Sequence, residues 1–180
     1  MTRFVKMVAE RYLNIPAVSL ALFAACTGSL LIAYVAEHYF DVFPCILCVY
    51  QRIPYALVAF LALFAFMFRR HDMFARRMLA LCALAFLVNG GIAVYHSGVE
   101  LHWWAGTDEC SVNPFVLKEV AKPENLREAL LQTPLVNCDE INFTFMGYTM
   151  ANWNILASLG LAIVAFMGIF SEQLKQKILR

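Results

Sequence analysis

The sequence predicts an all-α membrane protein built as an antiparallel bundle of four transmembrane helices. Of its 180 residues, 62% are hydrophobic and 15% are charged, whereas soluble domains average about 45–50% apolar and about 25% charged residues. Four apolar segments are long enough to cross the roughly 30 Å hydrocarbon core of a bilayer. Because unpaired backbone groups are costly in hydrocarbon, all four should be helical. We therefore expect one integral membrane domain that covers residues 1–180.

Each helix is indicated by a nearly uncharged run. The first run extends from Tyr12 to Ala36 without a charge, which is too long for the apolar region of a signal peptide. The second contains a single charge, Arg52, near its start. The expected helices cover residues of about 14–36, 49–68, 78–96 and 152–170, and a long loop covers residues of about 97–151.

Charge asymmetry between the connecting segments predicts the orientation of the bundle. The connection between the second and third helices carries four arginines and one aspartate, and both terminal segments are also rich in basic residues. The long segment after the third helix has eight acidic and three basic residues. Since basic segments tend to remain in the cytoplasm, both termini should be cytoplasmic and two loops extracytoplasmic.

Four of the six cysteines fall in these two outer loops. Cys45 and Cys48 form a CxxC pair in the first loop, and Cys110 and Cys138 lie in the second. Disulfides persist in oxidising compartments, and four cysteines permit three pairings. The short spacing favours a Cys45–Cys48 pair, which leaves Cys110 with Cys138. The other two cysteines lie within predicted helices, where free cysteine packs as a small hydrophobe: Cys26 and Cys82.

The CxxC pair at the membrane edge indicates redox chemistry. Its small ring opens and recloses easily, as thiol–disulfide exchange requires. Electrons from a soluble dithiol would pass to the second-loop pair, then to the CxxC pair, and finally to a quinone dissolved in the membrane. Arg52 follows Cys48 by one helical turn and is placed to stabilise a thiolate or polarise a quinone carbonyl. His96, at the outer end of the third helix, is a candidate for managing quinone protons.

Other interpretations of these residues stay open at this point. The four outer thiols could hold zinc, or they could form inert disulfides in a non-catalytic four-span membrane protein of tetraspanin type. The tetraspanin type is expected to carry a CCG motif, which this sequence lacks. An enzyme of the vitamin K epoxide reductase type would carry its CxxC after the loop pair rather than before it. Nucleic acid is not an expected partner, because the net charge is only +1 and basic residues form no patch with aromatic ones.

The stretch from Pro44 to Arg52 fits the pattern PCxLCxxxR. Together with four apolar segments and two further cysteines in the second outer loop, it resembles the bacterial disulfide bond formation protein B (DsbB) family. The resemblance covers nearly the whole chain. It implies a protein-dithiol:quinone oxidoreductase of the bacterial inner membrane, which reoxidises a periplasmic thioredoxin-fold protein similar to DsbA.

The resemblance also implies a catalytic role for each outer cysteine. Cys45 and Cys48 would form the pair linked to quinone, with Cys48 next to the bound quinone. Cys110 would be attacked by the reduced DsbA-like partner, giving a transient mixed disulfide. Cys138 would then hand the exchange on to Cys45.

Cofactor and membrane contacts complete the expectations. The resemblance implies that Arg52, His96 and Cys48 bind the quinone, which would be ubiquinone or menaquinone. Membrane lipid is the other expected contact. Within the long loop, the segment Pro123–Leu131 is typical of a short helix, with a proline near its start and an apolar face.

Overall fold

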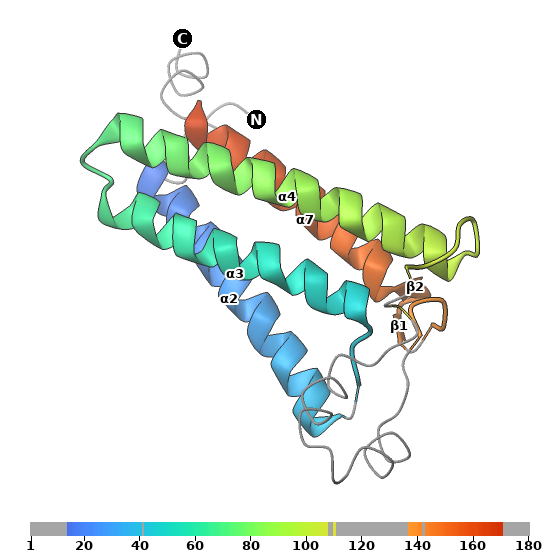
Figure 1. Cartoon of the computed structure of the whole chain (residues 1–180). Helices are drawn as coiled ribbons and strands as arrows, with labels where there is room; N and C mark the ends of the chain where they lie inside the picture. The colour runs from blue at the N-terminus through green and yellow to red at the C-terminus, as the bar shows by residue number, and fades with distance from the viewer. Residues whose placement is uncertain (1–13, 41, 108–109, 111–136, 142, 171–180) are drawn as a thin grey trace, which may run out of the picture.

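The computed structural model describes residues 14–40, 42–107, 110, 137–141 and 143–170. In this part of the chain, four long helices run back and forth to form an elongated bundle, with a small hairpin before the last helix (Figure 1). Each of the four is long and apolar enough to cross a membrane, which confirms the predicted four-helix membrane fold. The elements are α2 Ile15–Tyr39, α3 Ile46–Met67, α4 Asp72–Glu100, β1 Thr144–Phe145, β2 Tyr148–Thr149 and α7 Met150–Ile169.

The helices extend further than the apolar runs alone predicted. α3 begins at Ile46, so that Cys48 lies in its first turn. α4 covers Asp72–Glu100 and comprises 29 residues, or about 43 Å at 1.5 Å per residue. The polar residues at its end were expected in the loop, but they form hydrogen bonds with the neighbouring helices. His96 consequently lies inside a helix rather than at its end.

The carboxyl end of α4 is shaped by a Schellman motif. His102 has a positive φ of 56°, and its N–H donates to the Val99 carbonyl while the Trp103 N–H donates to the Gly98 carbonyl. This pattern satisfies the last carbonyls of a helix and reverses the chain. A Cβ on Gly98 would lie 2.0 Å from the Trp104 ring, so only glycine lets the indole fold back here. The reversal directs the following segment toward Cys110.

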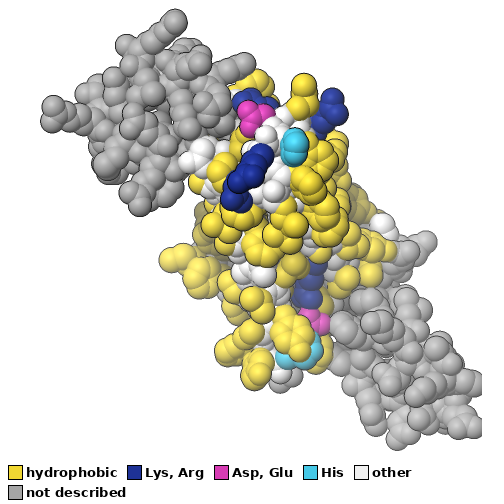
Figure 2. Space-filling view, turned by 90° about the vertical axis from the view of Figure 1, so that its left-hand side faces the viewer, with side chains coloured by type: hydrophobic (Ala, Val, Ile, Leu, Met, Phe, Trp, Pro, Cys, Tyr) yellow, Lys and Arg dark blue, Asp and Glu magenta, His cyan; other side chains and the backbone are white. Residues whose placement is uncertain are grey.

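The interior of the bundle contains many small residues. α4 packs closely against α7, and α3 lies between α2 and α4. Small side chains let helices approach in a membrane, where the hydrophobic effect does not drive association. Large apolar side chains cover much of the outer surface in Figure 2, with charged side chains toward the two ends. The small buried residues on the packed faces include Ala62, Ala65, Ala75, Ala83, Ala93, Ser158, Ala162, Ala165 and Gly168.

The hairpin between β1 and β2 positions the start of α7. Met146 and Gly147, its two central residues, both have positive φ, as a type I′ turn requires. Phe145 pairs with Tyr148, and the Phe145 carbonyl also accepts a 3.0 Å hydrogen bond from the Trp153 indole. The hairpin is thereby fixed to the helix that follows it.

Some expectations are not addressed by this part of the chain. The predicted Pro123–Leu131 helix lies outside the described residues. The cytoplasmic location of both termini and the single-domain organisation also stay predictions.

We expect Gly168→Ala to destabilise the bundle, because the new Cβ would lie 2.8 Å from Val18 and 2.9 Å from Leu79. Overpacking of this kind costs about 1–3 kcal/mol. The matched control is Gly160→Ala on the same helix, where no atom lies within 4 Å of the new Cβ. Thermal unfolding in detergent should show a lower midpoint for Gly168→Ala only. Equal midpoints for the two variants would contradict this packing.

Candidate active site

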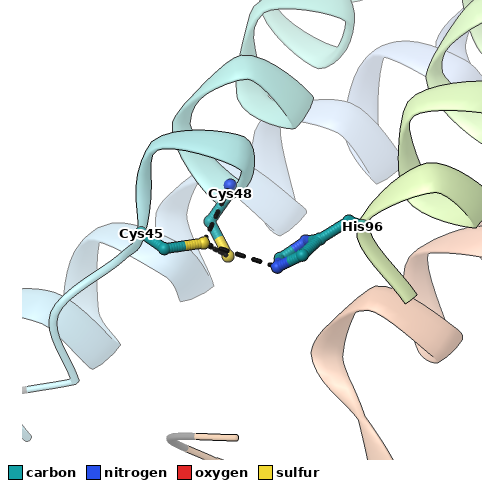
Figure 3. A group of neighbouring side chains, drawn as sticks. All are labelled: Cys45, Cys48 and His96. Carbon is teal, nitrogen blue, oxygen red and sulfur yellow. Dashed lines mark hydrogen bonds between the residues drawn. The ribbon is translucent and has the colours of Figure 1, made fainter. Parts of the chain in front are cut away.

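The site is built around the Cys45 sulfur at the amino end of α3 (Figure 3). Cys45 is the N-cap residue of the helix, and its Sγ accepts the Cys48 backbone N–H at 3.4 Å. The Cys48 Sγ lies 3.3 Å from the Cys45 Sγ. Backbone N–H groups and the helix dipole at this position favour negative charge on sulfur. These groups offset part of the cost of a buried thiolate at Cys45.

His96 approaches the CxxC pair from α4. Its Nε2 atom lies 3.5 Å from the Cys45 Sγ (Figure 3) and 3.7 Å from a carboxylate oxygen of Glu100. The His96 residue is only 2% exposed, so the imidazole meets the sulfur away from water. The histidine expected near the quinone is thus in direct contact with the CxxC pair.

The two second-loop cysteines reach the same place. Cys138 lies against both Cys45 and Cys110 and influences the acidity of both thiols. These three cysteines form a buried apolar cluster with Leu47 and Val99, and Cys48 packs against its edge. The fold therefore brings together all four cysteines that the sequence singled out. Their contacts follow the order Cys110, Cys138, Cys45, Cys48.

Crowding of these thiols changes their acidity. The hydrogen bond with Cys138 lowers the pKa of Cys45, but the bond with Cys48 and burial outweigh it and raise the pKa to about 12. The contact with Cys45, followed by burial, raises the pKa of Cys138. Burial is the main cause of the raised pKa of Cys110. In the dithiol state these thiols therefore keep their protons at neutral pH.

Arg52 lies one turn beyond Cys48 on α3, as the spacing predicted, but it also has a partner on another helix. Its guanidinium donates a 2.6 Å hydrogen bond to the carboxylate of Glu37 on α2. The Arg52 side chain is 31% exposed and the Glu37 side chain 9%. The sequence analysis did not single out Glu37, which fixes the position of this cation.

Two further polar residues near the site were missed from the sequence. Gln51 donates to Nδ1 of His96 at 3.2 Å and accepts from the Asn154 amide at 2.6 Å. Gln51 and Asn154 lie in otherwise apolar helices, where polar side chains usually face the bundle interior and have a function. The sequence could have indicated a polar helix face here, because Gln51 and Tyr55 are four residues apart, as are Asn154 and Ser158. Residues with this spacing share a helix face.

A hollow of about 400 Å³ lies beside Cys110. Its walls include Val99, Trp103, Trp104 and Thr107, and the Thr107 hydroxyl lies 3.4 Å from the Cys110 Sγ. Although only 7% exposed, Cys110 therefore borders this hollow. In contrast, Cys26 and Cys82 are buried in the bundle core.

Comparison with known proteins identifies relatives along nearly the whole chain. The family model for the disulfide bond formation protein DsbB matches residues 16–168. Disulfide bond formation protein B of Xylella fastidiosa is 27% identical over 157 residues, covering 87% of this chain and 90% of that protein. The protein of the same name from an Azoarcus species is 28% identical over 161 residues, covering 87% and 93%. An uncharacterized Rickettsia prowazekii protein is 24% identical over 166 residues, covering 92% and 90%.

The raised thiol pKa values predict a pH-dependent stability of the reduced protein. An unfolded cysteine ionises near pH 8.5, whereas folded Cys45 holds its proton until about pH 12. Between these values the unfolded state binds fewer protons, so the free energy of unfolding falls as pH rises. The oxidised protein, with its cysteines in disulfides, should lack this loss. Thermal unfolding of both forms from about pH 7 to pH 10 tests this prediction. A reduced form that became more stable as pH rose would contradict it.

Proposed function

Because the chain belongs to the DsbB family of disulfide bond formation proteins, we propose that it reoxidises a DsbA-like thioredoxin-fold protein and delivers the electrons to a membrane quinone. The observation that carries the proposal is the unbroken series of contacts from Cys110 through Cys138 and Cys45 to Cys48. In this proposal the site faces the periplasm, both termini are cytoplasmic and the bundle resides in the bacterial inner membrane.

The first exchange opens the second-loop disulfide. A thiolate of the reduced partner attacks the Cys110 sulfur, a partner–Cys110 bond forms, and the Cys110–Cys138 bond breaks. Cys138 leaves with the electron pair as a thiolate. Because the contacts around Cys138 raise its pKa, this thiolate is produced by bond cleavage rather than by free ionisation. It forms against Cys45 and is immediately positioned to react.

The second exchange transfers the disulfide between the loops. The Cys138 thiolate attacks Cys45, a Cys45–Cys138 bond forms, and Cys48 leaves as a thiolate. The partner's second thiolate then closes the partner's own disulfide and releases Cys110. When Cys110 attacks Cys138, the second-loop disulfide re-forms and Cys45 leaves as a thiolate. The two electrons now reside on the CxxC pair.

The surroundings of Cys48 fit a quinone. Cys48 is only partly buried, unlike the other three cysteines of the site, and Arg52 provides a partly exposed cation one turn away. A quinone bound there would accept two electrons and two protons as the Cys45–Cys48 disulfide re-forms. Arg52 would stabilise negative charge on the quinone oxygen, held in place by Glu37.

The residues that line the hollow beside Cys110 favour a protein as the electron donor. The hollow beside Cys110 has tryptophan walls, and aromatic residues are enriched where proteins bind one another. A non-catalytic protein with structural disulfides would gain nothing from a second cysteine pair in contact with the first. Four thiols in series instead suit transfer between two substrates that never meet.

The central test is quinone reduction by the full-length protein in detergent, driven by a reduced DsbA-like protein. We expect Cys48→Ser to abolish quinone reduction. Cys110→Ser combined with Cys138→Ser should block electrons from the protein donor but not those from dithiothreitol.

We expect Arg52→Ala to raise the KM for a short-chain quinone about tenfold, the effect of losing one charge-assisted hydrogen bond, while the mixed disulfide at Cys110 still forms.

Matched controls use the two cysteines that lie in the bundle core. Cys26→Ala and Cys82→Ala remove buried thiols of the same type, and their rates should equal that of the unmodified protein. Normal electron transfer from the protein donor in the Cys110→Ser, Cys138→Ser variant would refute the relay. Short-chain ubiquinone and menaquinone analogues, compared in parallel, would identify the acceptor.

A further inference from the structure

A chain of buried hydrogen bonds extends from His96 into the bundle core. The imidazole Nδ1 lies 3.2 Å from the Gln51 Nε2, and the Gln51 Oε1 accepts from the Asn154 Nδ2 at 2.6 Å. The Asn154 Oδ1 then accepts from the Tyr55 hydroxyl at 2.8 Å and from the Asn89 Nδ2 at 3.3 Å. Three helices, α3, α4 and α7, contribute to this chain.

The hydrogen bonds of this chain all run in one direction, from Asn89 toward His96. An amide nitrogen can only donate a hydrogen bond, and the Asn89 Nδ2 contacts both Asn154 and the Ser158 hydroxyl, the latter at 2.8 Å. The Asn154 oxygen faces Asn89, and the Asn154 nitrogen faces Gln51. Gln51 presents its oxygen to Asn154 and its nitrogen to His96.

We propose that Gln51 is a positioning residue that holds His96 in the tautomer whose Nε2–H points at the Cys45 sulfur. Since Gln51 donates to Nδ1, this nitrogen carries no proton in the neutral ring. The proton must then reside on Nε2, which lies 3.5 Å from the Cys45 Sγ. Asn154 acts one step further away by orienting Gln51. The inference rests on the proposed function, because it concerns the same exchange site.

The charges around His96 agree with an Nε2–H at this position. A carboxylate oxygen of Glu100 lies 3.7 Å from Nε2 and can only accept while ionised. α7 contributes the uncharged Asn154 to the chain and Thr149 as a donor to Glu100. The ionisable groups on the elements around the imidazole are Cys45, Cys48 and Arg52 of α3, Glu100 of α4, Glu37 of α2 in its ion pair with Arg52, and Cys138 in contact with Cys45.

The same hydrogen bonds disfavour the zinc interpretation. The donor atoms of Cys45, Cys48 and His96 lie within 4.8 Å of one another, a spacing compatible with a metal ion. A ligating histidine, however, binds metal through a bare nitrogen and donates its other N–H to an acceptor. Gln51 presents a donor to Nδ1 and so enforces the opposite arrangement. This arrangement favours donation of a hydrogen bond to the Cys45 sulfur over ligation of a metal ion.

This tautomer assists the step in which Cys45 is the leaving group. When Cys110 attacks Cys138 of the Cys45–Cys138 disulfide, the Cys110–Cys138 bond forms and Cys45 departs with the electron pair. The Nε2–H donates a hydrogen bond to this thiolate as its charge develops, together with the Cys48 backbone N–H. The opposite tautomer would place a nitrogen lone pair against the anion.

Nuclear magnetic resonance of the full-length, fully reduced protein in detergent tests the proposal without quinone or partner. Ring ¹⁵N labelling distinguishes the two tautomers, and loss of the signal in His96→Phe assigns it among the four histidines. We expect Nε2–H in the unmodified protein and protonated Nδ1 in Gln51→Glu, whose carboxylate can only accept. Gln51→Met should leave a mixture of tautomers.

Controls separate positioning from folding. Ser19→Ala removes a buried hydroxyl that bonds to the Ile15 carbonyl in α2, far along the sequence from the site, and should leave the His96 tautomer unchanged. If Gln51→Met fails to fold, the isosteric Gln51→Glu variant decides alone. Protonated Nδ1 in the unmodified protein, or a bare Nδ1 in Gln51→Glu, would overturn the proposal. Because neither quinone nor partner is present, such a result would leave the proposed electron transfer standing.

Discussion

The position of one sulfur atom, at the amino end of α3, determines how the rest of the site works. The Cys45 Sγ accepts the Cys48 backbone N–H and lies within 3.5 Å of both the Cys48 sulfur and the His96 imidazole, while Cys138 contacts it from the second loop. An N-cap sulfur of this kind is part of the helix, and the Cys48 backbone N–H can donate to it when negative charge develops. The first-loop pair, the second-loop cysteine and the histidine therefore all meet at this one atom.

The second constraint is that polar groups inside a membrane bundle must find partners within it. Most of the buried polar side chains near the site do so, through the amide chain between His96 and Asn154 and the Thr149–Glu100 contact. The Asn89 Oδ1 is an exception, buried without a hydrogen-bond partner among the described residues. Such a group costs about 1–3 kcal/mol. The Asn89 amide nitrogen, in contrast, donates to the Ser158 hydroxyl and to Asn154.

The sequence was sufficient for the helices and the cysteines but not for the groups that orient them. Long apolar runs and the CxxC spacing are local features, so they predicted four spans and a redox pair. The contact of Cys138 with Cys45 depends on how a distant loop returns to the bundle, which periodicity does not encode. Glu37 was not singled out because its partner, Arg52, lies on another helix. Gln51 and Asn154 left a signal as polar residues within apolar spans, and their relation to His96 emerges only when three helices are packed together.

The central claim is that Cys138 exchanges directly with Cys45, and a disulfide-trapping measurement addresses it most directly. In a Cys48→Ser, Cys110→Ser double variant, the two reacting sulfurs lose their other partners. We expect mild oxidation of this variant to yield an intramolecular Cys45–Cys138 disulfide in most molecules, detected by mass spectrometry of non-reduced peptides. If both thiols instead stayed free, or crosslinked only between molecules, the contact would not support exchange and the relay would be refuted.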